Sequence, residues 1–396
     1  MKIKRLPEDF QVAELSDMTP TGGPFALYRM SKRSLGTPEA IDEIIRRWHI
    51  PRSQVSYGGL KDRHAITQQY ITVRNGPPRG LSEKNLELCY LGRCPLPFTP
   101  KDFTGNRFTI VMRDMSEREL NDALRAIPRV AVDGLPNYFD DQRFGSVGES
   151  GEFIGRAWCR GDYERALWLA LADFHPDDPH DERIQKQLLK DHWGRWPECK
   201  GALSRSNRRS IVTYLADKPP DRPDYRGAFA LLKIDLRGLY LSAFQSFVWN
   251  RMLARHLRRQ VAAERLTDVQ LKLEPQPFFT QLEDSERESL EVTPLPLPSA
   301  RLHLDEGPML TLIQEVLGEL ELELREMRVK YPRDSFFSKG ERAAMVAVQN
   351  LTHETGEDEL YPGRHRLTLG FDLPRGSYAT ILVKRLTECG GLGARD

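Results

Sequence analysis

The sequence predicts an α+β protein in which one sheet domain, built from both ends of the chain, is interrupted by a mainly helical insertion. Strand-like alternation of apolar residues occurs near both termini, at 66–73 and 365–373. From about residue 152 the pattern changes to helices joined by long polar connections. A chain of 396 residues is long enough for two or three domains of ordinary size.

Composition narrows the class of protein. Hydrophobic residues make up 39% of the chain and charged residues 29%, which is typical of a soluble globular protein. We find no apolar run of about eighteen residues and no apolar signal core at the N-terminus, so we expect no membrane span, no secretory signal and a cytoplasmic location. The five cysteines are odd in number and lack a C-x-x-C pair, which argues against a disulfide framework and a cysteine zinc site. Because the net charge is only +1, any nucleic-acid surface must be a local patch.

The N-terminal elements are predicted from local patterns. Phe10 and Val12 alternate with polar residues, as on a short strand. Thr37 before Pro38 begins an amphipathic helix that Pro51 ends. A strand then covers 66–73, where β-branched and aromatic residues are concentrated.

Two strand-then-helix units follow. Residues 107–113 alternate as a strand, and Ser116 with Glu119 forms a capping box for the next helix. Near the C-terminus, 365–373 is the clearest strand of the chain. Ser377 is the predicted cap of a helix that glycines 390 and 391 end, and Tyr378 lies at that strand-to-helix corner.

Asp62 is the first candidate functional residue. It lies in the stretch GGLKDRHAITQQYITV, residues 58–73, where Gly58 and Gly59 permit unusual backbone angles. A carboxylate on a loop before a rigid strand, with Lys61, Arg63 and His64 as neighbours, is well placed to remain charged and act as a nucleophile. The alternative is a solvated surface carboxylate in a polar turn.

A second candidate is the irregular segment 134–151, GLPNYFDDQRFGSVGESG. It contains aromatic residues, an amide, an arginine and several glycines without a helical or strand period, which indicates a loop. Asn137 can read a base edge, and Gln142 and Arg143 can contact phosphate or sugar. Its aromatic residues, Tyr138, Phe139 and Phe144, can stack on bases or anchor the loop in the core.

The helical middle offers weaker candidates. In DFHPDDPHD, 173–181, His175 and His180 lie among four aspartates, which allows a metal site but fits an acidic linker better because no helix organises the ligands. The basic run 202–212 allows a phosphate contact or a solvated helix start. The helix from 241 to 259 has an apolar core face with polar groups that can border a cleft, and a further long helix is predicted over 309–327.

Four blocks together resemble the TruD family of tRNA pseudouridine synthases. They are PEDFQVAE at 7–14, GGLKDRHAITQQ at 58–69, LPNYFDDQRFG at 135–145 and LPRGSYATILVKRL at 373–386. Their order and spacing agree with the family across both ends of the chain. Within the insertion only LSAFQSFVWNRML, 241–253, looks like the family's corresponding helix.

The resemblance implies a role for particular residues. Asp62 matches the catalytic aspartate, and Phe10, Asn137 and Tyr378 match positions that line the target uridine. Lys4 matches a basic residue of the same pocket. The family usually has Phe where this chain has Tyr378, a change that keeps the aromatic ring and adds a hydroxyl.

The resemblance also implies an architecture and a substrate. The fold is a mixed, largely antiparallel sheet with flanking helices, so 1–150 and 341–396 would form the catalytic domain and 151–340 the insertion. The substrate is tRNA, modified at uridine 13, and the chemistry needs no metal or redox cofactor. We expect a monomer that contacts no membrane. An RNA-binding module without catalysis, and a metal-dependent hydrolase using His175 and His180, are the alternatives.

Overall fold

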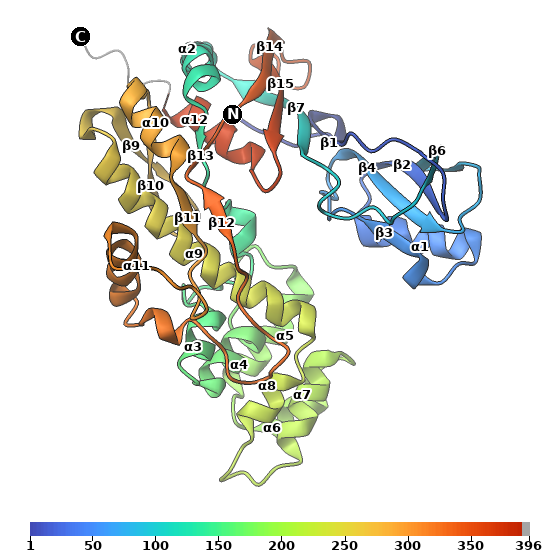
Figure 1. Cartoon of the computed structure of the whole chain (residues 1–396). Helices are drawn as coiled ribbons and strands as arrows, with labels where there is room; N and C mark the ends of the chain where they lie inside the picture. The colour runs from blue at the N-terminus through green and yellow to red at the C-terminus, as the bar shows by residue number, and fades with distance from the viewer. Residues whose placement is uncertain (390–396) are drawn as a thin grey trace. The chain divides into compact units, whose positions relative to one another are not determined.

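The computed structural model describes residues 1–389 (Figure 1) and divides them into two compact units. The first unit contains Met1–Asn137 and the chain from Met345 onward, and the second contains Tyr138–Ala344. Residues 138–150 and 341–344 thus fall in the second unit, whereas the sequence-based division assigned them to the first. The reason is packing: the Tyr138 ring stacks on Phe278 of the second unit, with ring centroids 5.4 Å apart.

Nine of the strands described in the first unit form a single sheet. The pairs are antiparallel except β1 with β4, so the predicted mixed, largely antiparallel sheet is confirmed. Along the sheet the order is β14 (Gln349–Glu357), β15 (His365–Pro374), β7 (Gly105–Met115), β1 (Phe10–Leu15), β4 (Ile66–Arg74), β2 (Phe25–Arg33), β6 (Leu86–Cys94) and β5 (Leu81–Glu83), with β3 (Val55–Tyr57) also paired to β4. Strands from both ends of the chain therefore meet in one sheet.

The register of these strands creates one continuous buried face. Val12 of β1 pairs with Phe108 of β7, which pairs with Phe371 of β15. All three are buried, and the Phe108 and Phe371 rings stack at 5.3 Å. On the β2 and β4 half, α1 (Thr37–Trp48) packs through Ile41 and Ile44. On the β7 and β15 half, α2 (Glu117–Asp133) contacts the sheet and α12 (Ala379–Glu388) contacts α2.

The N-terminal segment is attached to this sheet by a buried ion-pair network. Arg113 of β7 binds Asp9 at 2.8 Å and Asp358 at 3.1 Å, and all three residues are buried. The other Asp9 oxygen accepts from the Leu6 backbone N–H at 2.9 Å. Because removing one partner of a buried pair leaves an uncompensated charge, this network fixes the chain that leads into β1.

The chain leaves and re-enters the first unit at one place. Two short strands, β8 (Leu135–Pro136) and β13 (Met345–Val346), pair antiparallel, with Pro136 opposite Met345. Gly134, just before β8, has a left-handed φ of 66°, and its Cα lies so close to the Val346 carbonyl that a Cβ there would clash. A glycine is therefore required at this crossing.

The second unit is mainly helical and is organised around the long helix α9 (Ile234–Gln260), yellow in Figure 1. Buried aromatic residues of α9, among them Phe244 and Trp249, occupy its core. The other elements are α3 (Ile154–Cys159), α4 (Tyr163–Leu171), α5 (His180–Asp191), α6 (Trp196–Ala202), α7 (Asn207–Ala216), α8 (Tyr225–Ala230), β9 (Leu266–Gln270), β10 (Pro275–Phe279), α10 (Asp284–Val292), β11 (Pro294–Pro296), α11 (Pro308–Glu319) and β12 (Glu341–Ala343).

Several local predictions are confirmed and others need correction. The capping box is present, since the Ser116 hydroxyl accepts from Glu119 N–H and the Glu119 carboxylate accepts from Ser116 N–H. The helix predicted over 309–327 ends at Glu319, and Glu321 has a left-handed φ of 53°. Tyr378, rather than Ser377, is the N-cap residue of α12, and the predicted glycine stop lies outside the described residues. No helix within 1–389 is both long and apolar enough to cross a membrane.

Candidate active site

Asp62 lies on the loop between β3 and β4, where its side chain is about one-third exposed. Neither Gly58 nor Gly59 has a left-handed φ, so their predicted conformational role is wrong. Gly58 is required for close packing instead, because a Cβ there would come within 2.8 Å of the Phe103 ring. The loop is thus pressed against the sheet domain while its carboxylate reaches the surface.

Lys4 is the ion-pair partner of Asp62. Its Nζ lies 3.0 Å from Asp62 Oδ2 and 3.9 Å from the centroid of the Phe10 ring. The three residues Lys4, Phe10 and Asp62 therefore form one group, although Asp62 is 58 residues from Lys4 in the sequence. Lys4 itself has a left-handed φ of 56°, which is unfavourable for a residue with a side chain and is often found where function fixes the geometry.

The buried side chain of Lys32, on β2, forms hydrogen bonds to the backbone of this loop. It is only 2% exposed, and its Nζ donates to the carbonyl oxygens of Leu35 at 2.7 Å, Lys61 at 3.3 Å and Asp62 at 2.9 Å. Burial lowers the pKa of Lys32 to about 8, and the Asp62 charge opposes this shift. Lys32 was not among the residues predicted from the sequence. The signal was available, because the alternation of β2 places it on the same face as buried Tyr28 and Met30.

Lys61 does not pair with its neighbour Asp62. Its Nζ reaches Glu14 at 3.0 Å and the Asn106 side-chain oxygen at 2.9 Å, both on the sheet. Burial raises the pKa of Glu14, and the ion pair with Lys61 opposes that shift. Arg63 lies 3.5 Å from Glu39 on α1. The cations adjacent in sequence thus anchor the loop to the domain, and the counter-charge of Asp62 comes from Lys4.

A buried polar chain completes the support of the loop. The Lys61 backbone N–H donates to the Thr37 hydroxyl at 3.0 Å, and that hydroxyl donates to Gln69 at 2.9 Å. The Gln69 amide in turn donates to the Gly59 carbonyl at 3.1 Å. Backbone groups of Gly59, Lys61 and Asp62 are therefore bound to side chains of α1, β2 and β4, which restricts the movement of the carboxylate.

Asn137 and Tyr378 belong to a second group. Asn137 is 6% exposed, and its side-chain oxygen accepts from the Ser377 hydroxyl at 3.4 Å. Tyr378, the next residue, is half-buried. The Phe103 ring lies 4.8 Å from Lys61 Nζ and 5.7 Å from the Arg375 guanidinium, so it contacts sequence neighbours of Asp62 and of Tyr378.

The aromatic residues of the 134–151 segment are core residues of the second unit. Tyr138, Phe139 and Phe144 are all buried. Asn250 of α9 binds Phe139 twice: its side-chain oxygen accepts from the Phe139 N–H and its amide donates to the Phe139 carbonyl, each at 2.9 Å. Among the polar groups of this helix, which were predicted to be able to border a cleft, Asn250 is 3% exposed; it fixes this loop and also lines a small cavity.

The acidic segment around His175 and His180 has local contacts. The His175 ring nitrogen accepts from the Asp177 backbone N–H at 3.2 Å, and Asp178 pairs with Lys186 at 3.1 Å. His180 is the first residue of α5. Among residues 1–389 we find no group of three or more His, Cys, Asp or Glu side chains arranged to hold a metal ion.

Comparison with known proteins places this architecture in a family. The family model described as tRNA pseudouridine synthase D (TruD) matches residues 1–386. The chain is 29% identical to "Probable tRNA pseudouridine synthase D 2" of Methanocaldococcus jannaschii, over 97% of this chain and 91% of the relative. It is 27% identical to "tRNA pseudouridine synthase D" of Leptospira interrogans, over 97% and 95%.

A solved structure shows the same fold. The crystal structure of a TruD protein from Methanosarcina mazei matches with a TM-score of 0.73 and 26% identity, covering 98% of this chain and 93% of that one. The protein is therefore an isomerase of the pseudouridine synthase class. The chain belongs to the tRNA pseudouridine synthase D (TruD) family.

Proposed function

We propose that this protein converts uridine to pseudouridine in tRNA, at position 13, with Asp62 as the catalytic group. The observation that supports the proposal best is the ion pair of Asp62 with Lys4 at 3.0 Å, on a loop whose backbone is held by buried polar side chains. A charged, positioned and partly exposed carboxylate is what a nucleophile or general base requires. In this proposal the first unit is the catalytic domain and the second is an insertion.

The proposed reaction is an isomerisation, so uridine and pseudouridine contain the same atoms. The bond from C1′ to N1 of uridine breaks, and a bond from C1′ to C5 forms. The proton on C5 is lost and N1 gains one, so no external reactant is consumed. Asp62 can attack C1′, attack the base, or remove a sugar proton to give a glycal. All three routes use an unprotonated carboxylate next to the sugar, and Lys4 supplies its counter-charge.

The remaining site residues have proposed roles in holding the base. A uridine must leave the base stack of the RNA to reach a carboxylate. The site therefore needs aromatic or polar side chains that hold the flipped base. Tyr378 is proposed to stack on the flipped base, and Asn137, held by Ser377, to bind its edge. Phe10 is 3% exposed with Lys4 over its ring, so it lines the site mainly by positioning Lys4.

The test is Asp62→Asn, assayed by pseudouridine formation in a tRNA transcript. The amide keeps the shape of the side chain but can act neither as nucleophile nor as base, so turnover should vanish while tRNA affinity stays near that of the native protein. Asp17→Asn, which changes an exposed aspartate of the same unit, is the matched control. Residual turnover above about 1%, a barrier increase of less than about 3 kcal/mol, would contradict the catalytic role.

Two further measurements separate the alternatives. A tRNA with cytidine in place of uridine 13 should yield no pseudouridine, and product formed in that transcript would reject the position. Normal tRNA binding without any turnover by the native protein would favour an RNA-binding module.

A further inference from the structure

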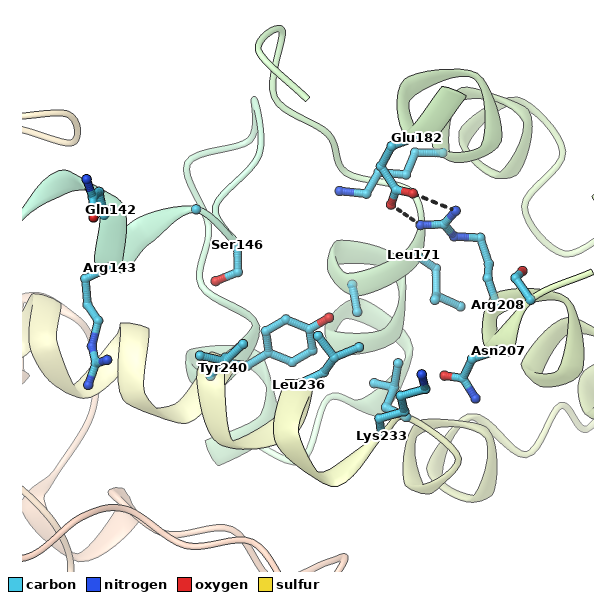
Figure 2. A pocket seen from close by; sticks show the side chains of 16 residues that line it. Gln142, Arg143, Ser146, Leu171, Glu182, Asn207, Arg208, Lys233, Leu236 and Tyr240 are labelled. Carbon is cyan, nitrogen blue, oxygen red and sulfur yellow. Dashed lines mark hydrogen bonds and ion pairs between the residues drawn. The ribbon is translucent and has the colours of Figure 1, made fainter. Parts of the chain in front are cut away.

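A cavity of about 510 Å³ lies within the second unit, and its lining includes none of the residues assigned above to catalysis or uridine binding (Figure 2). Its wall is formed by the short helix η3 (Asp141–Phe144) and by residues of α4, α5, α7 and α9. The size falls in the range of pockets that bind small ligands. Its ionisable lining is mostly cationic: Arg143, Lys186, Arg208 and Lys233 against a single acidic residue, Glu182.

Much of this positive charge is not neutralised within the cavity. Glu182 is engaged by the Arg208 guanidinium, as Figure 2 shows, and Lys186 pairs with Asp178. Among the described residues, the Arg143 guanidinium contacts the Ser246 hydroxyl, at 3.3 Å, and the Phe139 ring, and it forms no ion pair. Lys233 is exposed and forms no ion pair with any described residue. The cavity therefore presents two cations, Arg143 and Lys233, to an anionic ligand.

Helix ends add to this positive potential. Ser206, Asn207 and Arg208 line the cavity at the N-terminus of α7. Lys233 is the N-cap residue of α9, and no side chain caps the first amides of that helix. Helix N-termini carry partial positive charge and unpaired N–H groups, so they favour phosphate.

The inner wall of the cavity is apolar with a few polar groups. Leu236 and Tyr240 project from the same side of α9 in Figure 2, and Leu171 and Asn207 also line the cavity. Burial raises the pKa of Tyr240 to about 12, so its hydroxyl is neutral at physiological pH and can hydrogen-bond. Apolar side chains with an amide and a hydroxyl are suited to a nucleobase, whose faces are apolar and whose edges are polar.

We propose that this cavity binds one unpaired nucleotide of the RNA substrate. Arg143 and Lys233 lie at opposite ends of the cavity in Figure 2, so they can bind the phosphates on the two sides of that nucleotide. Its base enters between Leu236 and Tyr240. The rim is open to solvent, since Lys233 and Leu239 are exposed, which lets an RNA strand enter and leave. This proposal rests on the proposed function, because it takes RNA as the substrate.

Lys233→Glu in the full-length protein tests the phosphate contact. A negative side chain near the N-terminus of α9 complements the helix dipole, and Lys233 makes no capping hydrogen bond that the change would remove, so the variant should fold normally. Affinity for unmodified tRNA should fall roughly tenfold at low salt, and the slope of log Kd against log salt should decrease by about one. Lys339→Glu, an exposed lysine of the same unit that does not line the cavity, is the control.

Equal tRNA affinities of Lys233→Glu and Lys339→Glu would overturn the proposed nucleotide site. That result would not contradict the proposal that the protein forms pseudouridine. Conversely, a native protein that forms no pseudouridine but loses tRNA affinity in Lys233→Glu would reject the proposed function alone. The two failures are therefore distinguishable.

A second pair of measurements tests entry of the base. Leu236→Trp fills the cavity, and tRNAs carrying one abasic unpaired nucleotide remove the base but keep its phosphate. If the base enters the cavity, the tRNA that lacks that particular base should bind the native protein more weakly than intact tRNA does. In Leu236→Trp, removal of the same base should cause no further loss of affinity. Additive losses at every position would contradict base entry.

Uridine monophosphate is the probe for a free nucleotide. If the native protein bound it with a millimolar Kd, and Lys233→Glu abolished that binding while leaving tRNA affinity unchanged, the cavity would be a mononucleotide site and not an RNA site.

Discussion

At the scale of single residues, Tyr378 is the aromatic side chain of the candidate site that remains half-buried at a strand-to-helix corner. If its ring stacks on the flipped uridine, Tyr378→Phe should retain most activity, because the ring face is unchanged. Tyr378→Ala should lose about 1 to 3 kcal/mol in kcat/KM for tRNA. Melting temperatures of the same preparations supply the control. An alanine variant that melts much earlier but turns over tRNA at the native rate would assign Tyr378 to the core.

Lys32 is expected to position Asp62 without contacting substrate. Lys32→Met removes the three hydrogen bonds that hold the carbonyls of Leu35, Lys61 and Asp62. We therefore expect kcat to fall while the Kd for tRNA changes little. Lys84→Met, which changes an exposed lysine of the same unit, should leave both parameters unchanged. Loss of thermal stability with a native kcat would show that Lys32 has only a structural role.

The pH dependence of stability follows from the same lysine. Its pKa in the folded protein, about 8, lies below the ordinary value of 10.5, so between these pH values the unfolded chain holds more protons. Stability contributed by Lys32 therefore rises with pH over this interval. Relative to Lys32→Met, the free energy of unfolding of the native protein should increase by up to about 3 kcal/mol from pH 8 to 10.5. A constant difference in chemical denaturation would contradict the shifted pKa.

Sequence patterns locate such residues but do not assign their partners. Alternation places Glu14 on the face of buried Phe10 and Val12, and Lys32 on the face of Tyr28 and Met30. A charged side chain on a buried face needs a partner, so these positions were detectable. The partners Lys61 and the loop carbonyls were not, because those contacts join segments that only the tertiary fold brings together.

At the scale of elements, Asn250 shows how α9 organises the loop that precedes it. Asn250→Ala would leave both the N–H and the carbonyl of buried Phe139 without their partner. We expect the free energy of unfolding to fall by about 2 to 4 kcal/mol, measured by chemical denaturation. Ser242→Ala, at a half-buried position of the same helix, should change it little. A loss below about 0.5 kcal/mol would mean that the loop is held by its aromatic packing alone.

Elements with a strong period were predicted well, whereas loops and helix ends were not. The strands at 66–73 and 365–373 and the helix after Thr37 are present because burial of one face dictates their period. The helix from 309 was predicted too long, since Leu and Glu continue the pattern past Glu319, where the chain turns at Glu321. Leucine and glutamate favour helix in any context, so composition alone could not reveal this end.

At the scale of the whole molecule, the sequence predicted a sheet assembled from both ends of the chain. That prediction followed from strand patterns near each terminus, and the pairing of β15 with β7 is the contact that joins them. The limits of the second unit could not be predicted from composition, because Tyr138 and Phe139 continue the first unit's sequence block but pack in the second unit's core. Side-chain packing, rather than the sequence block, decides where one unit ends.

Because β8 pairs with β13, we expect that the second unit can be deleted from the chain without unfolding the first. Pro136 lies opposite Met345, so the ends of the first unit's two segments are already neighbours and a short linker can join them. Closing a short flexible loop carries a modest entropic cost. A chain in which a few glycines and serines replace 138–344 should fold cooperatively, as circular dichroism melting would show. An unfolded product would mean that the first unit depends on its insertion for stability. A folded one would be a minimal scaffold on which insertions can be exchanged.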